Sequence, residues 1–197
     1  MRNSHAAALM TLAIAAALLS GCKSPPTSFY TLSPDASIER SSDALTGAVV
    51  VGPVTVPDLV DRPQIVTRVS DNEVALNEFA RWGEPIRSGV ATTIAADLAR
   101  LLGSDRVSVS SQTVAGTESW RVRVDIVRFD SMPGDAVAID ALWTVHVAGR
   151  TALLTGRSTV REPVSGTGYD ALVAAHSRAL ASVSRDIATA IRHAPAS

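Results

Sequence analysis

The single cysteine of the chain, Cys22, is the residue whose setting points most directly to chemistry. It follows Leu19-Ser20-Gly21, an apolar residue and two small ones, which is the lipobox pattern of bacterial lipoproteins. Small side chains let a signal peptidase approach the backbone, and a cysteine thiol is the nucleophile that accepts a diacylglyceryl group. We therefore predict cleavage between Gly21 and Cys22 and lipidation of Cys22. The alternative is a plain signal peptide beside an incidental cysteine.

The residues before Cys22 have the character of a secretory signal peptide. Arg2 is followed by an apolar run from Ala6 to Leu19 that only Thr11 interrupts. As a helix this run would be roughly 21 Å long, whereas the hydrocarbon core of a bilayer is about 30 Å thick. The run therefore suits the apolar part of a signal peptide better than a membrane span. We expect residues 1–21 to be the signal, 22–28 a lipidated tether and 29–194 a single domain.

A lipidated Cys22 would anchor the mature chain to a membrane. A mature lipoprotein cysteine carries a diacylglycerol and an N-acyl chain, typically palmitate, and each buried methylene contributes about 0.8 kcal/mol to membrane binding. Lys23 follows the cysteine. Asp at that place favours retention in the inner membrane of enteric bacteria, so Lys23 favours the outer membrane, with the domain facing the periplasm.

Sequence motifs for catalysis, metal binding or phosphate binding are absent. The chain has no G-x-S-x-G, no H-E-x-x-H and no phosphate-binding loop, and Gly166-Thr167-Gly168 lacks the Lys-Ser/Thr of a P-loop. His146 falls on the polar side of a predicted strand, and His176 falls in the apolar stripe of a predicted helix. We therefore predict no catalytic residues, no metal and no cofactor besides the covalent lipid. A formal net charge of −1 without a basic tail gives no support to nucleic-acid binding.

Basic residues gather at one predicted strand. Arg121 and Arg123 share its polar side, and Arg128 follows. These side chains form either an ordinary solvated face or a surface for an acidic partner or phospholipid headgroups.

Alternation of apolar and polar residues predicts about seven strands after a brief β-like run at 29–32. They cover 48–56, 64–69, 74–79, 107–111, 120–126, 136–147 and 151–160. Apolar residues spaced by three and four predict two helices, one from Pro85 to Leu102 and one from Tyr169 to a point before Pro195.

These elements predict a single-domain α/β sandwich. A mixed, largely antiparallel sheet would be packed by the two amphipathic helices, and its last three long strands would form a meander because short turns join them. Pro53 cannot donate to a strand ladder, so it should mark a bulge or an unpaired edge position.

Several runs of the chain resemble the PqiC family, the ABC-type transport auxiliary lipoproteins. They occur in the family's order and span nearly the whole mature chain. The runs are Phe29 to Leu32, Val51 to Pro57, Asp61 to Arg68, Arg81 to Pro85 and Tyr169 to Ala175.

The resemblance implies an outer-membrane lipoprotein that faces the periplasm. Such proteins act with an MCE-domain protein and a membrane permease that move lipids between the two membranes, and some form homo-oligomeric rings. We accordingly expect a non-enzymatic docking subunit that supports envelope integrity. A lipid-binding carrier with a lipid pocket of its own is the main alternative, and a lipid-anchored hydrolase is a third.

Within this docking hypothesis, two short stretches are the expected contact surface. Arg and Trp are enriched among the residues that dominate binding energy at interfaces. The alternative is structural: Pro57 and Pro63 would rigidify a turn, and Trp82 would cap the core where the helix starts. The candidate partner-binding residues are Asp61, Arg62, Pro63, Gln64, Arg81 and Trp82.

Overall fold

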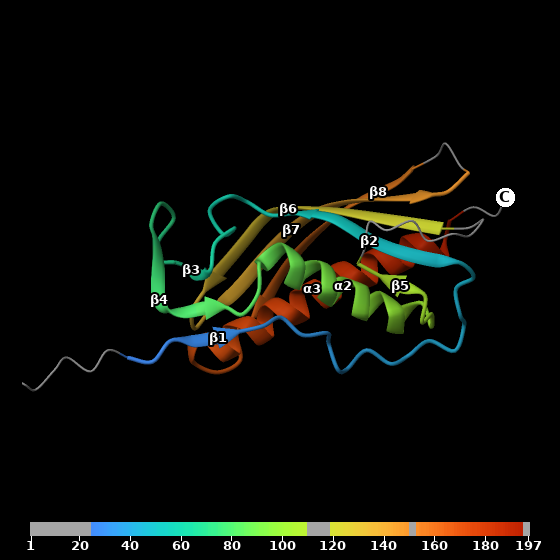
Figure 1. The fold of residues 1–197 in the computed structure, drawn as a ribbon. Coiled ribbons are helices and arrows are strands. Elements are labelled where there is room, and N and C mark those ends of the chain that lie inside the picture. Colours follow the sequence, from blue (N-terminus) through green and yellow to red (C-terminus); the bar gives the residue numbers. More distant parts are fainter. Residues whose placement is uncertain (1–24, 110–118, 150–152, 195–197) are drawn as a thin grey trace, which may run out of the picture.

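The computed structural model describes residues 25–109, 119–149 and 153–194. Within these residues the chain forms two β-sheets and two α-helices (Figure 1). The strands are β1 Ser28–Tyr30, β2 Ala48–Thr55, β3 Gln64–Arg68, β4 Val74–Trp82, β5 Val107–Ser108, β6 Ser119–Met132, β7 Ala136–Val147 and β8 Leu153–Pro163; the helices are α2 Ile86–Leu101 and α3 Gly168–Arg192.

The larger sheet has five strands in the order β5-β2-β6-β7-β8. Strands β6, β7 and β8 form the predicted antiparallel meander, while β2 runs parallel to both of its neighbours. The register of β2 against β6 shifts between Val51 and Val54, so the prediction of a bulge at Pro53 is confirmed.

The smaller sheet has the order β1-β4-β3. Strands β3 and β4 form the predicted hairpin around 70–73, and β1 adds to β4 in parallel. Between Gln64 and Val66 the pairing skips several residues of β4, and this strand is bent (Figure 1). The mixed α/β class is confirmed, but the strands form two sheets where one was expected: β4 pairs with β1 and β3 and not with the larger sheet. An ion pair of 2.8 Å between Arg68 and Asp130 joins β3 to β6.

Both helices cover the same side of the five-stranded sheet (Figure 1). Helix α2 packs against β2 and β5, helix α3 packs against β7 and β8, and the two helices contact each other. Gly103, with φ at +62°, ends the first helix. The predicted apolar stripe is buried along α2 through Ile86, Val90, Ile94 and Leu98, while Pro85 lies just before the helix.

The core lies between this helical layer and the sheet. One close approach depends on a glycine: a Cβ atom added to Gly156 would lie only 2.1 Å from the ring of Trp143, its cross-strand neighbour. The indole N–H of Trp143 donates to Ser158, whose hydroxyl donates to Asp186 of α3. These bonds connect the last two strands to the helix.

Candidate functional site

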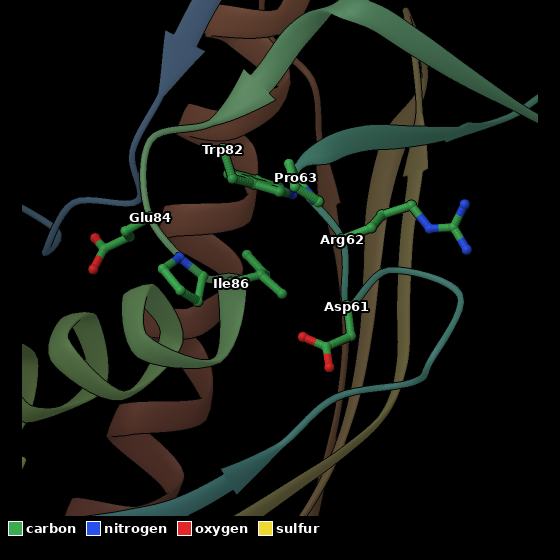
Figure 2. A pocket seen from close by; sticks show the side chains of 7 residues that line it. Asp61, Arg62, Pro63, Trp82, Glu84 and Ile86 are labelled. Carbon is green, nitrogen blue, oxygen red and sulfur yellow. The ribbon is translucent and has the colours of Figure 1, made fainter.

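A surface pocket of about 350 Å³ opens where three segments meet. The loop between β2 and β3 supplies one wall, and the end of β4 and the start of α2 supply the rest (Figure 2). The lining residues are Asp61, Arg62, Pro63, Trp82, Glu84, Pro85 and Ile86.

The floor of this pocket is apolar and continues the hydrophobic core. Trp82 is only 7% exposed, and its ring meets Phe129 and His176 edge to face at centroid distances of 6.3 and 6.4 Å. The Trp82 backbone N–H donates to the Pro63 carbonyl at 2.7 Å, which fixes the loop against the strand. The pocket is thus a place where a core aromatic residue reaches the surface between two prolines.

The rim of the pocket is charged. Asp61 forms an ion pair of 3.0 Å with Arg87, which links the loop to the first turn of α2. Arg62 is exposed and extends away from the tryptophan, and Glu84 lies at the opposite side of the pocket (Figure 2). An apolar centre with a polar rim is the usual layout of a protein-binding patch.

The loop that carries Asp61 and Arg62 is held by its own backbone. The N–H groups of Val60 and Asp61 both donate to the Pro57 carbonyl, at 3.0 and 3.2 Å, and the Arg62 N–H donates to the Val60 carbonyl at 2.8 Å. Pro57 therefore starts a tight turn, as the structural alternative for this residue expected. The turn presents Arg62 to solvent while Pro63 packs at the pocket.

The structure brings only some of the six predicted contact residues together. Four of them, Asp61, Arg62, Pro63 and Trp82, line the pocket. Gln64 and Arg81 form a cross-strand pair outside the pocket lining, and each donates to the Glu78 carboxylate, at 3.2 and 3.1 Å. Residues 84–86 line the pocket although the sequence did not single them out as contacts; their position just after Trp82 was the available signal.

Below the pocket floor lies a buried histidine. His176 is fully buried, stacks on Phe129 at 4.1 Å and shares a hydrogen bond of 2.8 Å with the Ser131 hydroxyl. Burial lowers the pKa of His176 to about 3, opposed by the Asp130 charge, so the ring stays neutral. His176 thus lies in the core, as its place in the apolar stripe of the helix indicated, and this serine–histidine pair has no exposed face for a substrate.

A second buried titratable group, Asp97 of α2, was missed by the sequence analysis. It is fully buried, accepts the Asp35 N–H at 3.0 Å, and accepts the Ser184 hydroxyl of α3 at 3.3 Å. Burial raises the pKa of Asp97 to about 6 despite these hydrogen bonds. Its position three residues after Ile94, beside the apolar stripe, was the one sequence signal that could have indicated its burial.

The basic residues of β6 lie on the open side of the five-stranded sheet, and two of them form ion pairs with nearby acids. Arg123 pairs with Asp125 at 2.9 Å, and Arg128 pairs with Asp130 at 2.7 Å. The side chains of Arg121 and His146 are exposed on the same face. The ion pairs favour the solvated-face interpretation of this surface.

The described residues contain neither a cluster of metal ligands nor a membrane-spanning helix. No group of three or more His, Cys, Asp or Glu side chains there is arranged to hold a metal ion. No helix in 25–109, 119–149 or 153–194 is long and apolar enough to cross a membrane. The residues of the lipobox, Gly21 and Cys22, fall outside the described part of the chain.

Fold and pocket together define an α/β domain with a small surface recess, and the comparison with family models gives the family. The chain belongs to the ABC-type transport auxiliary lipoprotein component family, whose model matches residues 30–188. The resemblance seen in the sequence is thereby confirmed. The family is one of membrane-anchored lipoproteins associated with ABC-type transport. A comparison with curated proteins gives no match.

Solved structures share this fold. A crystal structure described as that of an uncharacterized protein is 23% identical, with a TM-score of 0.70, and the match covers 85% of this chain and 99% of the other. A Xanthomonas campestris protein of the family DUF330 is 18% identical, with a TM-score of 0.59, covering 85% of this chain and 94% of the other. At these identities the likeness establishes the fold alone.

Proposed function

We propose that the protein is a non-enzymatic docking subunit of an MCE-type intermembrane lipid transport system. Three acyl chains on Cys22 would hold it at the outer membrane, facing the periplasm, and the domain would bind the MCE-domain protein of the transporter. Support comes from the family's association with ABC-type transport and from the lipobox in the sequence. Loss of this contact would compromise envelope integrity.

The observation that carries the proposal is the composition of the pocket. Trp82 and Ile86 provide an apolar base between Pro63 and Pro85, and a charged rim surrounds it. A tryptophan in a well-packed recess is a typical centre of binding energy, because a partner side chain that enters it is fully removed from water.

Anchoring makes a small recess sufficient for binding. A protein confined to a membrane meets its partner at a high effective concentration, so the second contact is close to intramolecular. Weak contacts at the pocket would then hold the transporter tip. A ring of several copies, as the family resemblance implies, would multiply the same contact.

The pocket volume favours docking over the carrier alternative. About 350 Å³ is near the lower end of small-molecule pockets. This volume has room for one or two side chains of a partner, whereas a phospholipid brings two long acyl chains. A carrier would also retain phospholipid in stoichiometric amounts, which native mass spectrometry of the purified protein would reveal.

Site-specific crosslinking in intact membranes tests the proposal. A photo-reactive amino acid replaces Arg62 on the pocket rim, and the matched control replaces Arg123 on the open side of the sheet. We expect the MCE-domain protein to be captured from position 62 and not from position 123. Failure to recover an MCE-domain protein from position 62 would overturn the docking role.

Release from the membrane tests the tether separately. A Cys22→Ala protein exported with a cleavable signal should fold and yet fail to repair the envelope defect of a deletion strain. Full repair by this soluble form would show that tethering is not the mechanism.

A further inference from the structure

Two of the three phenylalanines of the chain lie exposed on the small sheet. Phe29 of β1 is 67% exposed and Phe79 of β4 is 40% exposed, whereas Phe129 is buried in the core. Burying a phenylalanine stabilises a fold by about 1.5–3 kcal/mol. This fold leaves both side chains in solvent, so they are available for a contact outside the chain.

Both phenylalanines project from one face of the sheet. Phe29 lies directly opposite Arg81 in the parallel pairing of β1 with β4. Along β4, Ala80 and Trp82 are buried, while Phe79 and Arg81 point the other way. Phe29, Phe79 and Arg81 therefore form one surface, which we call the β1–β4 outer face.

The charge on this face is balanced locally. Arg81 forms an ion pair of 3.1 Å with Glu78, which also accepts a hydrogen bond from Gln64. The face thus combines two aromatic rings with a paired arginine. Aromatic and arginine side chains of this kind suit the headgroup layer of a bilayer, where rings enter the acyl boundary and polar groups meet phosphate.

The β1–β4 outer face lies close in sequence to the lipidation site, which points to a membrane as its contact. Phe29 lies seven residues after Cys22, a stretch that spans at most roughly 25 Å when fully extended. Strand β1 and the β3–β4 hairpin lie at the same end of the molecule (Figure 1). A bilayer that holds the acyl chains of Cys22 is therefore within reach of this face at all times.

We propose that the β1–β4 outer face rests on the phospholipid surface in which the lipid of Cys22 is embedded. This inference depends on the lipidation that belongs to the proposed function. Trp82 points from the opposite side of the same strand toward the pocket. Contact of Phe29 and Phe79 with the membrane thus turns the pocket away from the bilayer and toward a periplasmic partner.

Fluorescence quenching by lipid tests the contact. The full-length protein is purified with its anchor and reconstituted into vesicles of phosphatidylethanolamine and phosphatidylglycerol that contain brominated acyl chains. Cys22 is the only cysteine, and its thiol carries lipid in the anchored protein, so a cysteine introduced elsewhere is the one free thiol for an environment-sensitive dye. Labels are placed in Phe29→Cys, Phe79→Cys and, as matched control, Leu142→Cys. Leu142 is 42% exposed on the open side of the five-stranded sheet.

We expect several-fold stronger quenching and a blue-shifted emission at positions 29 and 79 than at position 142. A label in Arg62→Cys, on the pocket rim, should be quenched as little as the control. Equal quenching at all four positions would overturn the proposal. So would a label at 29 or 79 that is shielded from water but not quenched by brominated lipid, because that result identifies a protein contact such as a second copy.

Two further measurements distinguish failure of the lipid anchor from failure of the membrane-facing surface. The intact mass of the reconstituted protein shows whether Cys22 carries its acyl chains, and an unacylated mass would overturn the anchor on which the contact depends. An acylated protein with equal quenching would overturn the membrane-facing surface alone. Crosslinking at Arg62 reports on docking independently of both results.

Discussion

The two sides of the five-stranded sheet use the same strands for opposite purposes. Toward the helices, β6 and β7 present a continuous buried layer that includes Val122, Val124 and Trp143. Toward solvent, the alternate residues include arginines and the exposed Leu142. Arg123 and Arg128 form ion pairs with neighbouring acids on this side. The covered side has many packing contacts to lose, whereas the open side has few.

The difference indicates where this domain is able to bind a partner. On the open side, Arg123 and Arg128 already form ion pairs within the chain. The covered side offers apolar surface, but the two helices pack against it. Beside it, Trp82 of the smaller sheet packs on Phe129 of β6 and brings apolar surface to the pocket. Substitutions on the covered side should therefore lower the free energy of unfolding more than substitutions on the open side do.

Removing the pocket floor should have the largest effect. Trp82 is 7% exposed and packs on Phe129 and His176, so Trp82→Ala should lower the free energy of unfolding by about 3–5 kcal/mol. Denaturant unfolding measures this change. The matched control is Leu142→Ala on the open side, which should cost far less because Leu142 is 42% exposed. Equal losses in the two variants would contradict the contrast between the sides.

Acid should weaken the covered side through His176. The pKa of His176 is about 3 in the folded protein, below the usual 6.5. Between these two values the unfolded chain binds a proton at this residue and the folded chain does not. The stability that neutral His176 supports is complete above pH 6.5 and is lost as the pH falls toward 3. At pH 4.5 the loss is about 3 kcal/mol.

The test compares His176→Gln with the wild type at pH 7 and pH 4.5. Glutamine retains a polar atom for Ser131 but does not titrate in this range. The stability of the wild type should therefore fall relative to the variant by that amount as the pH is lowered. A difference that does not change with pH would show that His176 titrates normally in the folded protein.

Asp97 should respond to pH in the opposite direction. Its folded pKa of about 6 lies above the usual 3.8, so the folded chain holds the proton more tightly. The stability contributed by the protonated form is complete below 3.8 and is lost as the pH rises through 6. Asp97→Asn keeps an acceptor for the Asp35 N–H and removes the charge.

We expect Asp97→Asn to gain about 2 kcal/mol relative to the wild type between pH 4.5 and pH 7. Unfolding curves at the two pH values measure it. Ser184→Ala, which removes one hydrogen bond to this carboxyl, serves as a control that lacks the charge change. If Asp97→Asn is less stable than the wild type by the same amount at both pH values, the Asp97 carboxylate is well solvated in the folded protein.

Strand alternation explains how much of this was predictable from the sequence. Even-numbered residues from Trp120 to Ile126 were expected on one side of a strand, and they are buried. After Ile126 a register shift places Val127 and Arg128 both in solvent, so the phase changes and Phe129 turns inward. A bulge of this kind depends on the partner strand, which the local pattern does not contain.

The pocket was predictable in part for the same reason. The sequence predicts a contact surface made of the loop and the tryptophan, and the structure brings four of the six predicted residues to one recess. Gln64 and Arg81 lie next to members of this set in the chain, but strand geometry sends neighbouring side chains to opposite faces. To predict which of the six residues lie outside the pocket, the register of β3 on β4 must be known. To predict the burial of Asp97, the contact between two helices far apart in the chain must be known.

The open side should show the smallest effect. Arg123 and Asp125 form an ion pair of 2.9 Å with side chains 50% and 32% exposed, and exposed ion pairs contribute little because water screens the charges. Arg123→Ala should therefore shift the thermal midpoint by about 2 °C or less. Differential scanning calorimetry measures the shift, and crosslinking from position 62 in the same variant should be unchanged. A large fall in the midpoint, or loss of the crosslink, would show that the open side carries structure or binding that its paired charges conceal.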